Sequence, residues 1–288
     1  MTLPWSYSAI ADRPSGRWPN GATVALWVAV GVESYRPDDG LTEDILPRGT
    51  PPDLVNAAWR DYGNRVGAFR LLDGLAEIAI RPAMLLNSDL YDEAPAVLAA
   101  ARAARAEIVA HGKSNSDSLT ALPKGTEARY VAEVRARIAE MEGVPPDGWS
   151  SPWLAHTSTS LESLSATGYR YVLDFRLDDQ PVWLSTAAGR ILAIPYATEL
   201  NDSTSMVGRQ MDPRSFAAAL KDEAEELLKS QRPVVISVVL HSFISGQPWR
   251  MRPLMTALSE ILSMPGVWPT TPAEIHAAVL KAPGLAVD

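Results

Sequence analysis

The sequence predicts an α/β protein in which parallel strands form a closed or nearly closed, distorted (β/α) barrel. Short apolar runs alternate with longer amphipathic stretches along the chain. Strands that alternate with helices pair in parallel and are covered by those helices. At least five such units fit in 288 residues, and α/β barrels of this length routinely form one domain. We therefore expect residues 1–288 to form a single domain.

The expected elements follow from apolar runs and helix-capping signals. The predicted strands are 23–30, 83–86, 107–110, 169–173, 191–194 and 234–240. The predicted helices are 59–79, 94–104, 126–141, 213–229 and 271–280. Asp212 is the expected N-cap of the fourth helix. Thr271 and Glu274 form a capping-box pattern, with Pro272 at the first position of the last helix.

Composition excludes several classes of function. The chain has no cysteine, which removes thiol nucleophiles, thiolate metal sites and disulfides, and is compatible with a reducing compartment. The longest apolar run, 22–32, is shorter than the roughly 18 residues of a membrane span, and the first residues do not resemble a secretory signal. Net charge is −8, and Lys and Arg are scattered. We expect a cytoplasmic protein without nucleic-acid or membrane partners.

Polar side chains follow successive predicted strands. The carboxyl ends of barrel strands gather at one mouth, where barrel enzymes carry their chemistry. We therefore expect these side chains to converge. They are Glu33, Asn87, His111, Asp174 and His241.

Glu33 and the two strand-end histidines are the candidate catalytic groups. A carboxylate at the end of a buried strand is either a structural ion-pair member or a general base with a raised pKa. A single histidine is more often a satisfied core residue. His111 and His241 occupy equivalent positions and are two of only four histidines in the chain, which favours proton transfer. The other two, His156 in a polar loop and His276 on the last helix, are expected to have surface and structural roles.

Two further features leave alternatives open. The stretch 60–67 is dense in polar groups, as in an ion-paired helix start or a segment in which Arg65 positions substrate. Trp153, Trp183 and Trp249 fall in loops, where each serves in packing or walls a ligand pocket.

A zinc site is not predicted, and no cofactor is expected. No HxH or HxxxH pair occurs, and Asn115 stands four residues after His111. The sequence also contains no GxSxG elbow, P-loop or GxGxxG fingerprint.

Several motifs in one order resemble the polysaccharide deacetylase superfamily, and most closely its metal-independent, allantoinase-like branch. The resemblance runs from about Trp18 to the last helix. It rests on segments 18–22 with 31–34, 60–67, 81–83, 106–112, 171–183, 194–196 with 201–202, and 240–241 with 246–250. It implies a distorted barrel of the polysaccharide deacetylase type, one catalytic domain over residues 1–288, and a homo-oligomer.

The departures from that family concern its metal ligands. In the resemblance, the first acid corresponds to Glu33, and the acid that binds metal corresponds to Ser34 or Tyr35. The first ligand histidine corresponds to His111, but the second corresponds to Asn115. Ser151-Pro152-Trp153 stands where members often have an arginine before the proline. One retained ligand position is too few to hold an ion, which favours a metal-free reaction.

We therefore expect a hydrolase that opens a small cyclic amide, imide or ureide. Glu33 is the expected base on water, and His241 is expected to protonate the leaving nitrogen or stabilise the oxyanion. His111 orients water or substrate, with Asn115 as its partner. The remaining expected substrate contacts are Tyr35, Arg65, Asn87, Trp153, Asp174 and Arg250. Two alternatives stay open: an N-deacetylase of sugar or peptidoglycan with an atypical metal site, and a family member that binds a ring without turnover.

Overall fold

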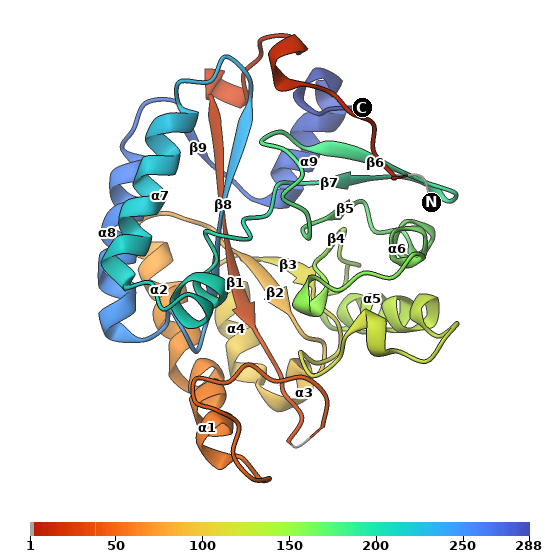
Figure 1. The fold of residues 1–288 in the computed structure, drawn as a ribbon, viewed down its shortest axis with the longest axis vertical. Coiled ribbons are helices and arrows are strands. Elements are labelled where there is room, and N and C mark those ends of the chain that lie inside the picture. Colours follow the sequence, from red (N-terminus) through yellow and green to blue (C-terminus); the bar gives the residue numbers. More distant parts are fainter. Residues whose placement is uncertain (1–2, 38) are drawn as a thin grey trace.

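The computed structural model describes residues 3–37 and 39–288. Its centre is a curled sheet with strand order β6-β7-β5-β4-β3-β2-β1-β8, and β9 pairs with the first residues of β1 (Figure 1). All pairings except β6–β7 are parallel. This architecture confirms the predicted α/β distorted barrel. The strands are β1 Val24–Val32, β2 Ala83–Leu86, β3 Glu107–Ala110, β4 Gly148–Trp149, β5 Tyr171–Val172, β6 Val182–Thr186, β7 Gly189–Ala193, β8 Val234–His241 and β9 Val267–Pro269.

Helices cover the outside of the sheet. Figure 1 shows α7 and α8 side by side next to β8, with α5 and α6 near β4 and β5. Within the described residues, no helix is both long and apolar enough to cross a membrane. The helices are α1 Leu54–Tyr62, α2 Ala68–Glu77, α3 Leu90–Glu93, α4 Pro95–Ala103, α5 Glu127–Glu142, α6 Ser160–Thr167, α7 Pro213–Leu227, α8 Pro248–Leu262 and α9 Pro272–Lys281.

The two faces of the sheet bury different sets of side chains. In β1, Val28 and Val30 point to the outer layer of helices, whereas Trp27 and Ala29 belong to the inner cluster. Side chains alternate between faces with period two, so position 33 continues the inner face. The same alternation in β8 places Val238 and Leu240 outside and Val239 inside, which sends position 241 inward. Alternation therefore aims the strand-end side chains into the barrel.

Two helix starts follow the predicted capping signals. Asp212 accepts hydrogen bonds from the backbone amides of Arg214 and Ser215 at the start of α7. Thr271 and Glu274 form the predicted capping box at the start of α9. Side chains of α9, including Ile275 and Val279, pack with the inner cluster. The last helix therefore fills the barrel interior on the side away from the strand ends.

The structure departs from the prediction at β6 and β7 and within the helix expected at 59–79. Strands β6 and β7 form an antiparallel hairpin, so the parallel alternation does not continue through that region. The helix is α1 and α2 joined by a π-helical turn, Gly63–Gly67. A Cβ atom on Gly67 would lie 1.9 Å from the carbonyl oxygen of Ser242. The glycines at 63 and 67 therefore allow this helix to contact the segment that follows β8.

Candidate active site

Three side chains from three strands meet at the carboxyl end of the sheet. Glu33 Oε1 lies 3.5 Å from His241 Nε2 and 3.8 Å from His111 Nε2. All three are buried or nearly so: Glu33 and His111 directly follow β1 and β3, and His241 is the last residue of β8. These separations are slightly long for direct hydrogen bonds, and a water molecule can bridge polar groups at such distances. The arrangement can thus hold a water between one carboxylate and two imidazoles.

Glu33 is held by contacts on both its side chain and its backbone. Tyr35 donates its hydroxyl to Glu33 Oε2 at 2.5 Å, and Asn115 Nδ2 donates to that hydroxyl at 2.9 Å. Asn64, from the π-helical turn, donates to the Glu33 carbonyl oxygen at 2.8 Å. Burial raises the pKa of Glu33 to about 7, although the charge of His241 and the Tyr35 hydrogen bond oppose that rise. Glu33 is therefore a stronger base than an exposed glutamate.

His241 is positioned by Asp202, a buried carboxylate. Asp202 Oδ1 lies 2.6 Å from His241 Nδ1, and Oδ2 accepts from the His241 backbone amide at 2.8 Å and from Ser245 Oγ at 2.5 Å. Burial opposes a charged imidazole here, but the carboxylates of Asp202 and Glu33 outweigh it and raise the pKa of His241 to about 10. His241 is thus a protonated donor at neutral pH, and its Nε2–H faces Glu33.

His111 differs from His241 in its charge. Its Nδ1 lies 2.8 Å from the carbonyl oxygen of Ser150, which fixes the proton on Nδ1 and leaves Nε2 as an acceptor. Burial lowers the pKa of His111 to about 4, despite the raising effect of that carbonyl. The site therefore combines a cationic imidazole and a neutral one, which suits a proton donor and a water-orienting acceptor.

These groups line a cavity of about 160 Å³. A larger groove of about 880 Å³ lies between α7 and α8, but it contains none of the three buried titratable groups. We assign the candidate active site to the smaller cavity because the perturbed groups converge there. The cavity is lined by Glu33, Glu43, Leu85, His111, Asn115, Ser151, Trp153, Leu154, Tyr196, Asn201, Ser203, Thr204 and His241.

Among the expected substrate contacts, Asn115 and Trp153 line the cavity. Trp153 adopts a left-handed backbone conformation, with φ 62°, and its Nε1 donates to the Asn115 carbonyl oxygen at 2.7 Å. Left-handed φ values are uncommon for bulky residues and concentrate at functional sites. Tyr35 does not line the cavity, but its hydroxyl contacts Glu33, which does.

Asn87 and Asp174 brace the site without lining it. Asn87 accepts from the Ser34 amide and donates to the His111 carbonyl oxygen, which joins the ends of β1 and β3. Asp174 accepts from the Ser151 amide and contacts His156 Nε2 at 2.7 Å. These two residues therefore hold neighbouring strand ends together.

Arg65 and Arg250 lie away from the cavity, and the expectation that either anchors substrate stays a prediction. The Arg65 side chain is 76% exposed and pairs with Asp61. The π-helical turn directs its glycines inward, which leaves Arg65 facing solvent. Arg250 is buried on α8, where it contacts the Ile244 carbonyl oxygen and lies over the Trp249 ring. His276 is packed against aromatic rings in the inner cluster, in agreement with its expected structural role.

Four residues of the site have no predicted role. Asp202 belongs to a motif noted in the sequence, but nothing in its spacing pairs it with His241. Asn64 lies within the polar stretch 60–67, next to Arg65, the residue of this stretch that was expected to position substrate. Tyr196 follows a proline in a loop, and Glu43 lies in a loop without any periodic pattern. Only the fold brings Glu43 and Tyr196 to the cavity.

The donor set does not fit the metal ion of the family's metal-dependent members. Within residues 3–37 and 39–288, no group of three or more His, Cys, Asp or Glu side chains is arranged to hold a metal ion. At the ligand positions, the Tyr35 hydroxyl donates to Glu33, and Asn115 binds Tyr35 through its NH₂ group. No reaction step is therefore assigned to a metal.

Comparisons with known proteins agree with the fold of this chain. No model of a protein family matches the chain. A Schizosaccharomyces pombe protein named "Putative polysaccharide deacetylase" is 23% identical over 297 residues, which cover 91% of each chain. The structure of Puue allantoinase superposes with a TM-score of 0.85 at 22% identity, over 94% of this chain and 95% of that one. A probable polysaccharide deacetylase from Pseudomonas aeruginosa PAO1 gives a TM-score of 0.82 at 24% identity, over 93% and 95%.

The curled sheet, with its polar site at the strand ends, defines a protein of the polysaccharide deacetylase fold. Over nearly its whole length, the chain resembles that superfamily and its allantoinase-like branch, as the sequence motifs indicate.

Proposed function

We propose that the chain is a hydrolase that opens a small cyclic amide, imide or ureide at a carbon–nitrogen bond. The observation that carries the proposal is the buried pair of Glu33 and His241. Burial makes the carboxylate more basic, and Asp202 keeps the facing imidazole protonated. A base and an acid with pKa values moved apart by their surroundings are the pair that general acid–base hydrolysis requires.

The reaction balances with these groups alone. Glu33 removes a proton from water as the water oxygen bonds to the ring carbonyl carbon. The neutral His111 accepts the second water proton in a hydrogen bond and orients the attack. His241 delivers its proton to the ring nitrogen as the carbon–nitrogen bond breaks. The product carries a new carboxyl group and a new N–H. The proton that Glu33 gained then passes to His241, 3.5 Å away, which restores both groups.

Tyr196 is the proposed donor to the oxyanion. Its ring is buried against Trp27, and it lines the cavity. Burial raises the pKa of the Tyr196 hydroxyl well above its ordinary value, with Asp174 and Glu33 adding to the rise. The hydroxyl therefore stays protonated and able to donate. One such donor contributes a factor of about 10² to 10³ to the rate.

The size of the expected rate enhancement favours an activated ring as the substrate. General acid–base catalysis contributes roughly 10² to 10⁴ in rate, and an oxyanion donor adds the factor above. Those contributions are small for an unactivated acetamide, but more adequate for an imide or ureide, whose carbonyl is already electron-poor. The cavity of about 160 Å³ is also below the roughly 300 Å³ at which pockets for drug-sized ligands begin. A single small ring fits such a volume.

The N-deacetylase alternative is supported by two similar proteins that are named as polysaccharide deacetylases. An acetylated sugar chain needs an open groove at the reacting carbon, whereas Trp153 and the loop that carries Glu43 border this cavity. The assay should therefore include acetylated chito-oligosaccharides beside cyclic imides, hydantoins and ureides.

Substitution of the base tests the proposal. Ring opening by the purified protein is measured as loss of the ring's ultraviolet absorbance and appearance of a carboxylate. Glu33→Gln keeps the shape of the side chain but removes its basicity, so kcat is expected to fall by about 10² to 10⁴. Asp39→Asn, at an exposed carboxylate outside the cavity, is the control. Wild-type turnover in Glu33→Gln contradicts the proposed base, and acetate release without ring opening favours the deacetylase.

A further inference from the structure

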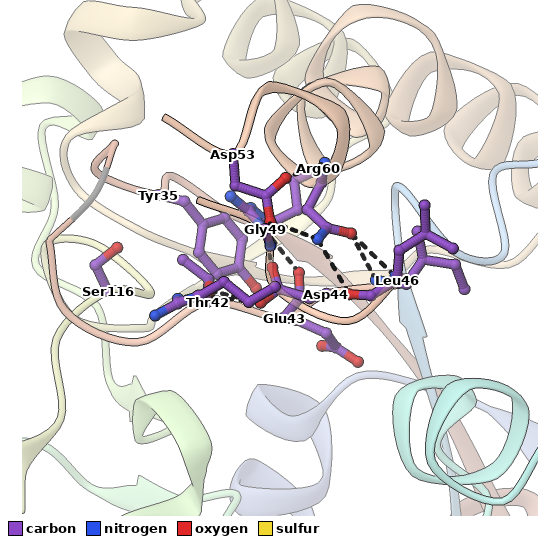
Figure 2. A network of polar contacts seen from close by, with 12 residues as sticks. Tyr35, Thr42, Glu43, Asp44, Leu46, Gly49, Asp53, Arg60 and Ser116 are labelled. Atoms are coloured by element: carbon purple, nitrogen blue, oxygen red, sulfur yellow. Dashed lines mark hydrogen bonds and ion pairs between the residues drawn. The ribbon is translucent and has the colours of Figure 1, made fainter. Parts of the chain in front are cut away.

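Two segments outside the strands contribute side chains to the wall of the cavity. One is the loop that carries Glu43, which Arg60 holds by donating to the Glu43 carbonyl oxygen at 2.9 Å (Figure 2). The other is the segment 150–154, in which Trp153 and Leu154 have left-handed backbone conformations, with φ 62° and 52°. Such conformations persist only where the surrounding structure holds them. Contacts from neighbouring elements must therefore fix this second segment.

The peptide unit between Ser150 and Ser151 connects the site to a further histidine. Its carbonyl oxygen lies 2.8 Å from His111 Nδ1, and its N–H donates to Asp174 Oδ1 at 2.8 Å. The other carboxylate oxygen, Asp174 Oδ2, lies 2.7 Å from His156 Nε2. A peptide unit is planar and rigid, so the bond to its N–H also sets the direction of its carbonyl oxygen. These contacts form one chain from His111 to His156.

The carbonyl oxygen determines which ring nitrogen of His111 carries hydrogen. A carbonyl oxygen only accepts, so the facing Nδ1 carries the proton and Nε2 keeps a lone pair. Asn115 also hydrogen-bonds to this ring. A side-chain amide can present either its oxygen or its NH₂ group, however, so Asn115 can adapt to both tautomers. The direction of the 150–151 peptide is therefore the contact that favours one tautomer.

Asp174 and His156 form a buried ion pair. The Asp174 side chain is fully buried, and the His156 side chain is only 16% exposed, although its polar loop led us to expect a surface role. Burial opposes a charged imidazole, but the hydrogen bond and the charge of Asp174 outweigh it and raise the pKa of His156. Among the described residues, His156 is the only cationic side chain that pairs with this carboxylate. Its loss would leave a buried charge without a counter-charge, which is costly.

We propose that Asp174 and His156 are positioning residues for His111. They hold the 150–151 peptide with its carbonyl oxygen toward His111, so that the neutral ring carries hydrogen on Nδ1 and keeps the Nε2 lone pair. The carboxylate bound to the peptide N–H also polarises the peptide and makes its carbonyl oxygen a stronger acceptor. The tautomer is a property of the folded chain, and only its effect on catalysis rests on the proposed function.

The tautomer of His111 can be observed by NMR without any substrate. The chain contains four histidines, so long-range proton–nitrogen correlation spectra of protein with isotope-labelled histidine are simple, and replacement of each histidine in turn assigns them. The nitrogen chemical shifts show which ring nitrogen carries hydrogen. Burial lowers the pKa of His111 to about 4, so the ring is neutral at about pH 7, and the wild type should show the Nδ1–H form.

Three variants test the chain of contacts. Asp174→Ala removes the acceptor of the peptide N–H, so the ratio of Nδ1–H to Nε2–H in His111 should fall about tenfold, as for the loss of one hydrogen bond. Asp174→Asn keeps an acceptor oxygen, and His156→Gln keeps a donor to Asp174, but both lose a charge; each should lower that ratio about threefold. Asp179→Asn is the matched control, because it removes a partly exposed carboxylate that follows β5 and pairs with Arg176, and should leave the ratio unchanged.

Turnover gives a second readout that general loss of structure would not imitate. In the proposed reaction, His111 orients the attacking water and does not anchor the ring. His156→Gln should therefore lower kcat by about 3- to 10-fold and leave KM within about twofold.

The outcomes separate this inference from the proposed function. Circular dichroism and unfolding temperature identify the folded variants; if Asp174→Ala does not fold, Asp174→Asn and His156→Gln decide. An unchanged His111 tautomer in every folded variant, or an Nε2–H form in the wild type, overturns the inference, while ring opening by the wild type still supports the proposed function. A tautomer that depends on Asp174 and His156 supports the inference even if the wild type opens no ring, and then only the proposed function is wrong.

Discussion

Replacement of Asp202 by asparagine should shift the alkaline limit of activity to lower pH and so narrow the pH range in which the enzyme works. In the proposed reaction, Glu33 acts when deprotonated and His241 when protonated. The wild-type kcat/KM should therefore rise through a pH of about 7 and fall through about 10, the pKa values of these groups. Asp202 lies 2.6 Å from His241 Nδ1 and is the largest source of the upward shift in the pKa of His241.

The size of the shift follows from the charge that Asp202→Asn removes. A unit charge about 4 Å away at an effective dielectric constant of about 20 contributes about 4 kcal/mol, which corresponds to about three pH units. The alkaline limb should move from about 10 toward about 7, and the maximal rate should fall by about fourfold, because about a quarter of the molecules would then carry a deprotonated Glu33 and a protonated His241 at about pH 7.

Initial rates of ring opening between about pH 5.5 and about pH 10.5 would define the acidic and the alkaline limb of the pH profile, because this range includes both pKa values. Ser245→Ala is the matched control, because it removes a hydrogen bond to Asp202 Oδ2 but keeps the charge. Its alkaline limb should move by less than about one pH unit. An unchanged alkaline limb in folded Asp202→Asn would refute the assignment of His241 as the acid.

Three further outcomes are expected. Burial raises the pKa of Glu33 from its ordinary 4.5 to about 7, so the folded state loses stability as the pH rises from about 4.5 to about 7. Glu33→Gln should therefore raise the free energy of unfolding at pH 8 by about 1–3 kcal/mol and change it little at pH 4, as measured by chemical denaturation. Gly31→Ala would place a Cβ 3.2 Å from His241 Cδ2 and 3.3 Å from Glu33 Oε1, so kcat should fall about tenfold, whereas Gly284→Ala, with open space around it, should not change kcat. Arg65→Ala should leave KM within about twofold, since its side chain is exposed and pairs with Asp61; a large rise in KM would instead support a role of Arg65 in binding substrate.

Much of the fold was predictable because apolar runs and caps are local signals. The strands β2, β3 and β8 agree closely with their predicted ranges, and the caps at Asp212 and Thr271 are present. The antiparallel β6–β7 hairpin was not predicted, because Gly189 is the one turn signal at its Ala187-Ala188 turn and its strands are only partly buried. Period-two alternation does not reveal the direction in which neighbouring strands pair.

The site was predictable only where a side chain ends a strand. Glu33, His111 and His241 occupy such positions, and the structure brings them within 4 Å of one another in pairs that include Glu33. Glu43 reaches the cavity through a loop whose path depends on Arg60 and Ser116, and no short-range pattern encodes that path. Sequence does not distinguish a substrate-binding Arg65 from a solvent-facing one, because an arginine beside glycines is compatible with both.

The separation of Glu43 from the strands has an evolutionary consequence. The proposed acid and base arise from β8 and β1, while Glu43, which also lines the cavity, belongs to a loop that Arg60 of α1 holds. Mutations in the loop can therefore change which heterocycle is accepted while the proton-transfer machinery stays intact. Descendants with new preferences are thus accessible through changes in a surface segment, without rebuilding the barrel.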